Sequence, residues 1–165
     1  MKYVFVFLLV GLTSLVHAQT AEQPNCDEIE GFQTADKDLI PEDYTGIAFK
    51  CKDGKVKGIH HWKDGKEDGL MRYWWGNGQL NLEWNYKDGK LDGLRRSWYA
   101  NGQIKDEMNY KDGQVGGLVR SWFEDGQLSY ERNYKDGKQI SEKCWDKDGN
   151  RIKCYDKYGN EIKFD

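Results

Sequence analysis

Three tryptophans, three arginines and three glutamates recur at a constant spacing, and together they could form a binding surface. They are Trp74, Trp98 and Trp122; Arg72, Arg96 and Arg120; and Glu83, Glu107 and Glu131. Trp and Arg are the residue types most often found at binding hot spots. The alternative interpretation is structural: the indoles would pack against the leucines and arginine stems beside them on a sheet. The sequence leaves both interpretations open.

The residues that could do chemistry do not form a catalytic or metal site. His60 and His61 are adjacent, and neighbouring side chains on a strand point to opposite faces. The carboxylates recur in similar surroundings, whereas a general acid and base need unlike environments. The repeated KDGK lacks the Gly-rich spacing of a phosphate loop. We therefore expect a protein that is not an enzyme, with no cofactor and no bound metal.

A 24-residue repeat dominates the chain from Lys63 to Tyr134, with copies that begin at Lys63, Lys87 and Lys111. Each copy contains an Asp-Gly pair and a later Asn-Gly or Asp-Gly pair, which are signals for tight hairpin turns. The segments between them have the length and composition of strands. The sequence predicts an all-β fold, an elongated and curled antiparallel meander of stacked β-hairpins in a single domain.

The turns also predict a register. A two-residue turn at Asn101-Gly102 pairs Tyr99 with Ile104, Trp98 with Lys105 and Arg96 with Glu107. The same rule pairs Arg72 with Glu83 and Arg120 with Glu131, and opposite charges that face each other across two strands are favourable. A turn at Asp88-Gly89 would likewise place Gly93 beneath the ring of Trp84.

Alternation along the strands then assigns two faces. We name them the tyrosine face and the tryptophan face, and we expect the more apolar tyrosine face to be the buried one. The tyrosine face is expected to hold Trp75, Tyr99, Phe123, Leu80, Ile104, Leu128, Tyr86, Tyr110 and Tyr134, with Gly69, Gly93 and Gly117 opposite the tyrosines. The tryptophan face is expected to hold Trp74, Trp98, Trp122, the Arg–Glu pairs, Leu70, Leu94, Leu118, Asn85, Asn109 and Asn133.

The motif GLxRSWYxNGQ, followed by ExNYKDGK, resembles the bacterial variant of the MORN repeat (membrane occupation and recognition nexus). The resemblance covers roughly residues 46–140, and many bacterial chains with such repeats are labelled YwqK-type antitoxins. It implies stacked β-hairpins in an elongated, curved sheet with a groove. It also implies a role in binding proteins, or lipid in some members, without catalytic residues.

The flanking segments differ from the repeats. Residues 1–18 combine one lysine, an apolar run and Val16-His17-Ala18, which predicts a signal peptide cleaved after Ala18. Residues 19–45 hold eight acidic side chains and one lysine, and we expect a loosely structured N-terminal cap. Residues 46–62 are a degenerate first copy within the 46–140 array. Residues 141–165 are expected to form a C-terminal strand-turn cap.

The four cysteines predict two disulfides, because an even number in an exported chain is typical of a disulfide framework. A turn centred on Gly149 would bring Cys144 opposite Cys154, which leaves Cys26 to pair with Cys51. Free, buried thiols are the alternative.

Composition limits the partners. The formal net charge of −3 offers no basic field for nucleic acid. The chain has no second long apolar run, so we expect no transmembrane segment in the mature chain. We expect a secreted, periplasmic or envelope-bound module that binds a protein partner, including an antitoxin- or immunity-like one. A cell-surface carbohydrate-binding module is the alternative, because choline-binding repeats are also short Trp/Tyr-rich hairpins. Lipid binding is third, since the negative charge disfavours anionic headgroups.

Overall fold

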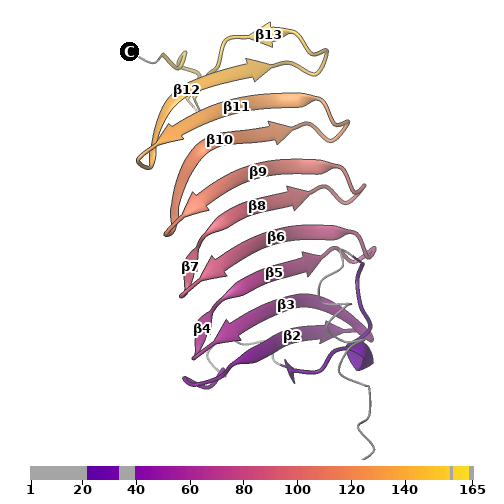
Figure 1. Ribbon diagram of the computed structural model, residues 1–165. Coiled ribbons are helices and arrows are strands. Elements are labelled where there is room, and N and C mark those ends of the chain that lie inside the picture. Colours follow the sequence, from indigo (N-terminus) through magenta and orange to yellow (C-terminus); the bar gives the residue numbers. More distant parts are fainter. Residues whose placement is uncertain (1–21, 34–39, 157, 164–165) are drawn as a thin grey trace, which may run out of the picture.

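The computed structural model describes residues 22–33, 40–156 and 158–163 of the chain, and they form a single sheet (Figure 1). The strands follow one another along the sheet in the order β1-β2-β3-β5-β6-β8-β9-β10-β11-β12-β13, and the short strands β4 and β7 pair with β3 and β6. Every pair is antiparallel except β1 with β2. The expected all-β meander of stacked hairpins is confirmed.

The elements have the following bounds. They are η1 (Cys26–Glu28), β1 (Phe32–Gln33), β2 (Gly46–Lys52), β3 (Lys55–Lys63), β4 (Lys66–Glu67), β5 (Gly69–Trp74), β6 (Leu80–Lys87), β7 (Lys90–Leu91), β8 (Gly93–Trp98), β9 (Ile104–Lys111), β10 (Gln114–Trp122), β11 (Leu128–Lys135), β12 (Lys138–Trp145) and β13 (Arg151–Ile152).

The Asp-Gly turns at one side of the sheet are the expected two-residue turns. At Asp88-Gly89, both residues have positive φ, +50° and +77°, and Lys87 pairs with Lys90 across them. Positive φ at both central positions is the geometry that matches the twist of the flanking strands. Asp tolerates this conformation better than most non-glycine residues, which explains its place before each glycine.

The Asn-Gly turns at the other side differ from the prediction. The Gly102 N–H donates to the Tyr99 carbonyl at 3.0 Å and the Tyr99 N–H donates to the Gln103 carbonyl at 2.9 Å, which closes a three-residue loop. Only Gly102 has positive φ, +86°. The predicted pairs Tyr99–Ile104 and Trp98–Lys105 are therefore wrong, and Trp98 pairs with Ile104.

A bulge after each of these turns restores the register. Asn81, Lys105 and Ser129 are the extra residues, each left without a partner between two paired neighbours. The predicted Arg72–Glu83, Arg96–Glu107 and Arg120–Glu131 pairs are therefore confirmed although the turn is longer than expected.

The bulge also moves three side chains to the other face. Leu80, Ile104 and Leu128 pair with Trp74, Trp98 and Trp122 and so lie on the tryptophan face, not on the tyrosine face. Trp75 and Tyr99 begin the turns and reach the next repeat. The Trp75 Nε1–H donates to the Trp98 carbonyl at 3.0 Å, and the Tyr99 hydroxyl donates to the Trp122 carbonyl at 2.8 Å.

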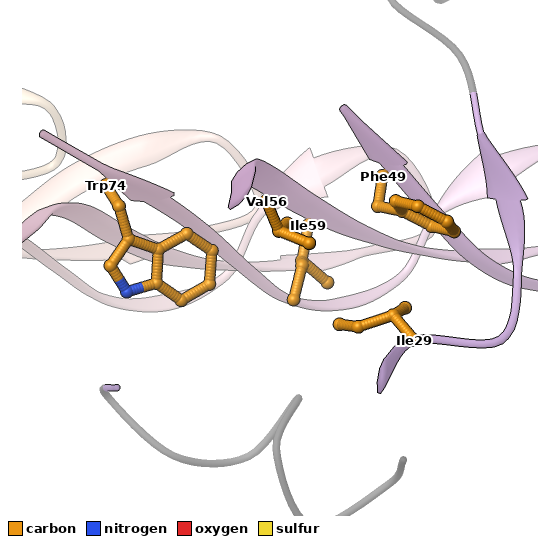
Figure 2. Close-up of a cluster of buried hydrophobic side chains, with 5 residues drawn as sticks. All are labelled: Ile29, Phe49, Val56, Ile59 and Trp74. Carbon is orange, nitrogen blue, oxygen red and sulfur yellow. The ribbon is translucent and has the colours of Figure 1, made fainter. Parts of the chain in front are cut away.

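The cluster of buried apolar side chains lies on the tryptophan face of the first strands (Figure 2). It consists of Ile29, Phe49, Val56, Ile59 and Trp74. The expectation that the tyrosine face alone is buried is thus wrong, because the segment that carries Ile29 covers the opposite face. The tyrosine face is also packed, with Met71 at 1% and Val119 at 3% exposure.

The described part of the acidic segment is bound to the sheet at several points and is not loose. The Val56 N–H donates to the Pro24 carbonyl at 3.1 Å and the Cys26 N–H donates to the Gly54 carbonyl at 3.0 Å. The predicted Cys26–Cys51 disulfide joins this segment to β2. Strand β1 pairs with β2 and so covers part of the first sheet edge, which would otherwise offer unpaired backbone groups.

The Cys144–Cys154 disulfide is also confirmed, but with a different register. Cys144 faces Ile152, and Cys154 is two residues further along. The cause is again a three-residue loop, in which the Gly149 N–H donates to the Asp146 carbonyl at 3.1 Å. Two disulfides are consistent with an oxidising compartment. The expected signal peptide lies outside the described residues, among which no helix is long and apolar enough to cross a membrane.

The position of Gly93 differs from the prediction. A Cβ on Gly93 would meet the Asn85 side chain at 3.5 Å and not the Trp84 ring, because the sheet pairing is interrupted at Asp92 between β7 and β8. A glycine that does lie beneath the ring of a neighbouring strand is Gly58, where a Cβ would come within 2.8 Å of Tyr73 Cε1.

We expect Gly58→Ala to lower the free energy of unfolding by about 1–3 kcal/mol, because the new methyl group would displace the Tyr73 ring. The matched control is Gly116→Ala, where a Cβ has no neighbour within 4 Å and φ is not positive. The control should be neutral or slightly stabilising. Urea midpoints at equal m-values measure both, and equal midpoints for the two variants would contradict the packing described here.

Candidate binding surface

A row of alternating charges crosses the tryptophan face in the middle of the strands. Each arginine pairs with a glutamate in its own repeat, and the adjacent repeats meet in the same way: Glu83 faces Arg96, and Glu107 faces Arg120. Glu131 faces Lys143 on the last long strand. The charge row, in spatial order, is Arg72, Glu83, Arg96, Glu107, Arg120, Glu131 and Lys143.

The charge row is covered at its N-terminal end and open at its C-terminal end. The Nε–Oε2 distances are 2.7 Å for Arg72–Glu83, 2.9 Å for Arg96–Glu107 and 3.1 Å for Arg120–Glu131. The exposed fraction of the arginine side chain rises from 10% at Arg72 to 39% at Arg96 and 42% at Arg120. A partner could therefore reach the last two arginines and not the first.

An apolar row lies beside the charge row, nearer the Asn-Gly turns. Trp74 is 4% exposed and belongs to the buried cluster, so it is not available to a partner, whereas Trp98 and Trp122 are half-buried. Indoles alternate with aliphatic side chains along this row. The apolar row, in spatial order, is Trp74, Leu80, Trp98, Ile104, Trp122, Leu128 and Trp145.

Trp145 is the member of the apolar row that sequence reasoning missed. It ends β12 two residues after Lys143, so alternation places it on the same face. The Arg151 guanidinium lies 5.5 Å from its ring centroid. Trp145 follows Trp122 by 23 residues, not 24, and it stands outside the regular repeat. Extending the alternation of the last repeat into 141–145 would have found it.

The side chains of the tyrosine face pack mainly against one another. Tyr73, Trp84 and Tyr86 form successive edge-to-face contacts at centroid distances of 6.3 and 6.1 Å. The Trp84 Nε1–H donates to Met71 Sδ at 3.0 Å, and the Arg95 guanidinium lies 5.6 Å from the Trp84 ring. These contacts satisfy the rings within the chain and leave the tryptophan face as the stronger candidate for a partner.

Burial is the main cause that raises the pKa of Tyr73, and the charge of Glu67 adds to it. The pKa of Tyr86 is raised for the same two reasons. Hydrogen bonds act in the opposite direction on Asp146, where the Asn150 N–H holds the carboxyl pKa below its usual value. All three shifts move the group away from the neutral range that general acid–base catalysis uses.

The potential metal ligands do not form a site among the residues with a described placement. Glu142, Cys144 and Cys154 lie close together, but the two sulfurs form a disulfide and are not thiolates. His60 approaches the Tyr73 hydroxyl and His61 approaches the Leu70 carbonyl. The two imidazoles lie on opposite faces of β3, as their adjacency predicts.

The fold and its surface define a class: a protein of stacked β-hairpins with a repeating side-chain array on each face. The family model described as MORN repeat variant matches residues 67–88, 91–112 and 116–136. Three segments of the chain are therefore similar to the MORN repeat variant, and repeats of this kind generally form binding modules without catalytic activity. No curated protein and no solved structure matches the chain.

The charge row predicts that exchanging the charges of Arg96 and Glu107 does not restore stability. In an isolated pair, exchanging the two charges restores the attraction that each single reversal removes. In the row, Arg96→Glu combined with Glu107→Arg places the introduced carboxylate beside Glu83 and the introduced guanidinium beside Arg120. We expect the double variant to be no more stable than either single variant, each losing about 0.2–1 kcal/mol per disturbed contact. Recovery of the original urea midpoint would show that the pairs act independently.

The stability of the chain at alkaline pH should depend on the half-buried phenol of Tyr73. Because the folded-state pKa of Tyr73 is raised, the unfolded chain loses its phenolic proton first. The contribution of Tyr73 to the free energy of unfolding should be constant below pH ~10. It should fall as the pH rises from there toward the folded-state pKa. Tyr73→Phe should reduce that fall in a pH series of unfolding curves. Tyr155→Phe, at a 58% exposed position, is the control and should leave the slope unchanged.

Proposed function

We propose that the chain is an exported, non-enzymatic module that binds a protein on the tryptophan face of strands β8 to β12. The observation that carries this proposal is the adjacency of half-buried indoles and open guanidiniums: Trp98 beside Arg96, and Trp122 beside Arg120. Large apolar side chains next to arginine are the typical composition of binding hot spots. The expected signal peptide and the two disulfides support export.

The shape of the surface favours an extended or flat partner. Equivalent side chains of successive repeats are two strands apart, which places them about 9–10 Å from one another. Indoles and charges at this spacing form a strip, so a partner has to contact several repeats at once. In the first repeat the N-terminal segment covers the equivalent position, Trp74, which sets one end of the available strip.

The charges favour a protein over the other partner classes. Both signs alternate along the strip, so a partner with charges of both signs can pair with it, whereas neutral sugars cannot use the alternation. The glutamates and the net charge of −3 oppose anionic lipid headgroups. A glycan remains the second candidate because indoles about 9–10 Å apart could stack on sugar rings along a chain. An antitoxin- or immunity-like role would be the case in which the bound protein is a toxin outside the cytoplasm.

Removal of one indole tests the proposal. We expect Trp98→Ala to weaken binding of a protein captured from the native envelope by roughly 2 kcal/mol or more, about 30-fold in Kd. The fold should survive, as circular dichroism melting would show. Titration calorimetry with the captured protein measures the change.

The control is Tyr110→Ala, an aromatic truncation on the other face of the adjacent strand. It should mainly lower the melting temperature and leave the affinity of the folded protein intact. Normal binding by folded Trp98→Ala would reject the tryptophan face as the binding surface. Binding to a glycan array that Trp98→Ala abolishes, with no protein captured, would favour the carbohydrate alternative.

A further inference from the structure

The tryptophan face is complementary to itself, and we propose that the protein it binds is a second copy of this chain. This inference rests on the proposed function, because it names the partner of the same surface. Its basis is the order of side chains in the charge row and the apolar row, which both alternate strictly from strand to strand.

The charge row limits the ways in which two copies can meet. When the two faces meet about a two-fold axis parallel to the strands, the strand order of the second copy is reversed. An axis between β9 and β10 then places β9 opposite β10, β8 opposite β11 and β6 opposite β12. Glu107 meets Arg120 of the second copy, Arg96 meets its Glu131, and Glu83 meets its Lys143. Every facing pair has opposite charge.

Arrangements in which the two-fold axis lies nearer the N-terminal end of the sheet are unfavourable. An axis along β9 itself places Arg96 opposite Arg120 and Glu83 opposite Glu131, which brings like charges together. An axis between β8 and β9 restores opposite charges, but it places β5, the strand of Trp74, opposite the long strand β11, whereas the axis between β9 and β10 places β5 opposite only the two-residue β13. The N-terminal segment already covers that part of the face, where Trp74 is 4% exposed.

An arrangement displaced toward the C-terminal end pairs fewer charges. An axis between β10 and β11 also brings opposite charges together, but it places β8 opposite β13. That strand has only two residues, Arg151–Ile152, and it ends the order of strands in the sheet. The arrangement centred between β9 and β10 is the one that pairs the whole open part of the charge row.

The apolar row fits the same axis. Each indole meets an aliphatic side chain of the second copy: Trp122 meets Ile104, and Trp98 meets Leu128. At the ends Trp145 meets Leu80, which is half-buried because it also packs against the buried cluster around Trp74. Large side chains opposite smaller ones allow two faces to interdigitate at the ~10 Å spacing of packed sheets. Because the axis pairs the same patch with itself, the assembly closes as a dimer.

Spacing explains why a sheet of the same kind suits this surface. The charges repeat at the ~4.8 Å distance between strands, and a second copy has the same spacing, so the match continues across the face. A helix presents a turn every ~5.4 Å and loses this match after a few positions. The face from β6 to β12 measures about 29 Å by 20 Å, or about 580 Å² on each copy. Two copies together would bury about 1,160 Å², which is below a standard interface but above the ~1,000 Å² expected of a biological one.

A zero-length carbodiimide cross-link tests the register. The reagent joins a carboxylate to an amine in direct contact, and Glu83 and Lys143 lie on strands about 24 Å apart within one chain. A Glu83–Lys143 link can therefore form only between two copies. We expect the oxidised chain to sediment with twice its monomer mass at 100 µM and to give a covalent dimer that contains this link. The contact between Lys143 Nζ and Glu131, 3.7 Å within one chain, is the internal reference for the reaction.

Two variants complete the experiment. Lys143→Arg keeps the charge and removes the reactive amine, so the link should vanish while the dimer persists in sedimentation. Trp122→Ala, beside the axis, should raise the dimer Kd at least tenfold, and Tyr110→Ala on the other face should not. A monomer at 100 µM, or a dimer that forms without the link and tolerates Trp122→Ala, overturns the inference. If a monomeric chain instead loses a different captured protein in the Trp98→Ala variant, only the identity of the partner is wrong and the proposed function stands.

Discussion

The bulge after each Asn-Gly turn decides which side chains share a face, and the rest of the structure follows from it. The three-residue loop shifts the returning strand by one position, and a shift of one position would exchange its two faces. The extra residue, Lys105 in the middle repeat, reverses that exchange before the strand reaches Glu107. Arg96 and Glu107 therefore stay opposite each other, while Ile104, which precedes the bulge, joins the indole of Trp98 on the tryptophan face.

The same turns connect one repeat to the next. The Asn77 side chain donates to the Ala100 carbonyl at 2.6 Å, and the Asn101 side chain donates to the Glu124 carbonyl at 2.9 Å. On the other side of the sheet, the Gly113 N–H donates to the Leu91 carbonyl at 2.7 Å. Each repeat is thus bonded to its neighbour at both turns as well as along the strands. Such nearest-neighbour contacts are what stabilise a one-dimensional array, and they require the constant period seen in the sequence.

The sequence was sufficient for the features that depend on strand alternation, on the Asp-Gly turns and on the number and position of the cysteines. The stacked hairpins, the Arg–Glu pairs, the two disulfides and the opposite orientation of His60 and His61 could all be predicted. The length of the Asn-Gly loops could not be predicted. The pair Asn-Gly suits both a two-residue turn and a three-residue loop, in which a type I turn is followed by a left-handed glycine. The covered face could not be predicted either. It depends on where Ile29 packs, and local alternation carries no information about the docking of a distant segment.

The proposed binding surface combines an accessible apolar row with a means of controlling what binds to it. Indoles alone would attract any flat apolar surface, since the hydrophobic effect is not directional. The charge row beside Trp98 and Trp122 adds direction, because a displacement of one strand brings like charges together. Charges at the edge of an interface contribute more to specificity than to affinity. In the proposed interface the apolar row would supply the attraction and the charge row would set the register. The N-terminal segment covers the end of the face that carries Trp74, so neither row is open there.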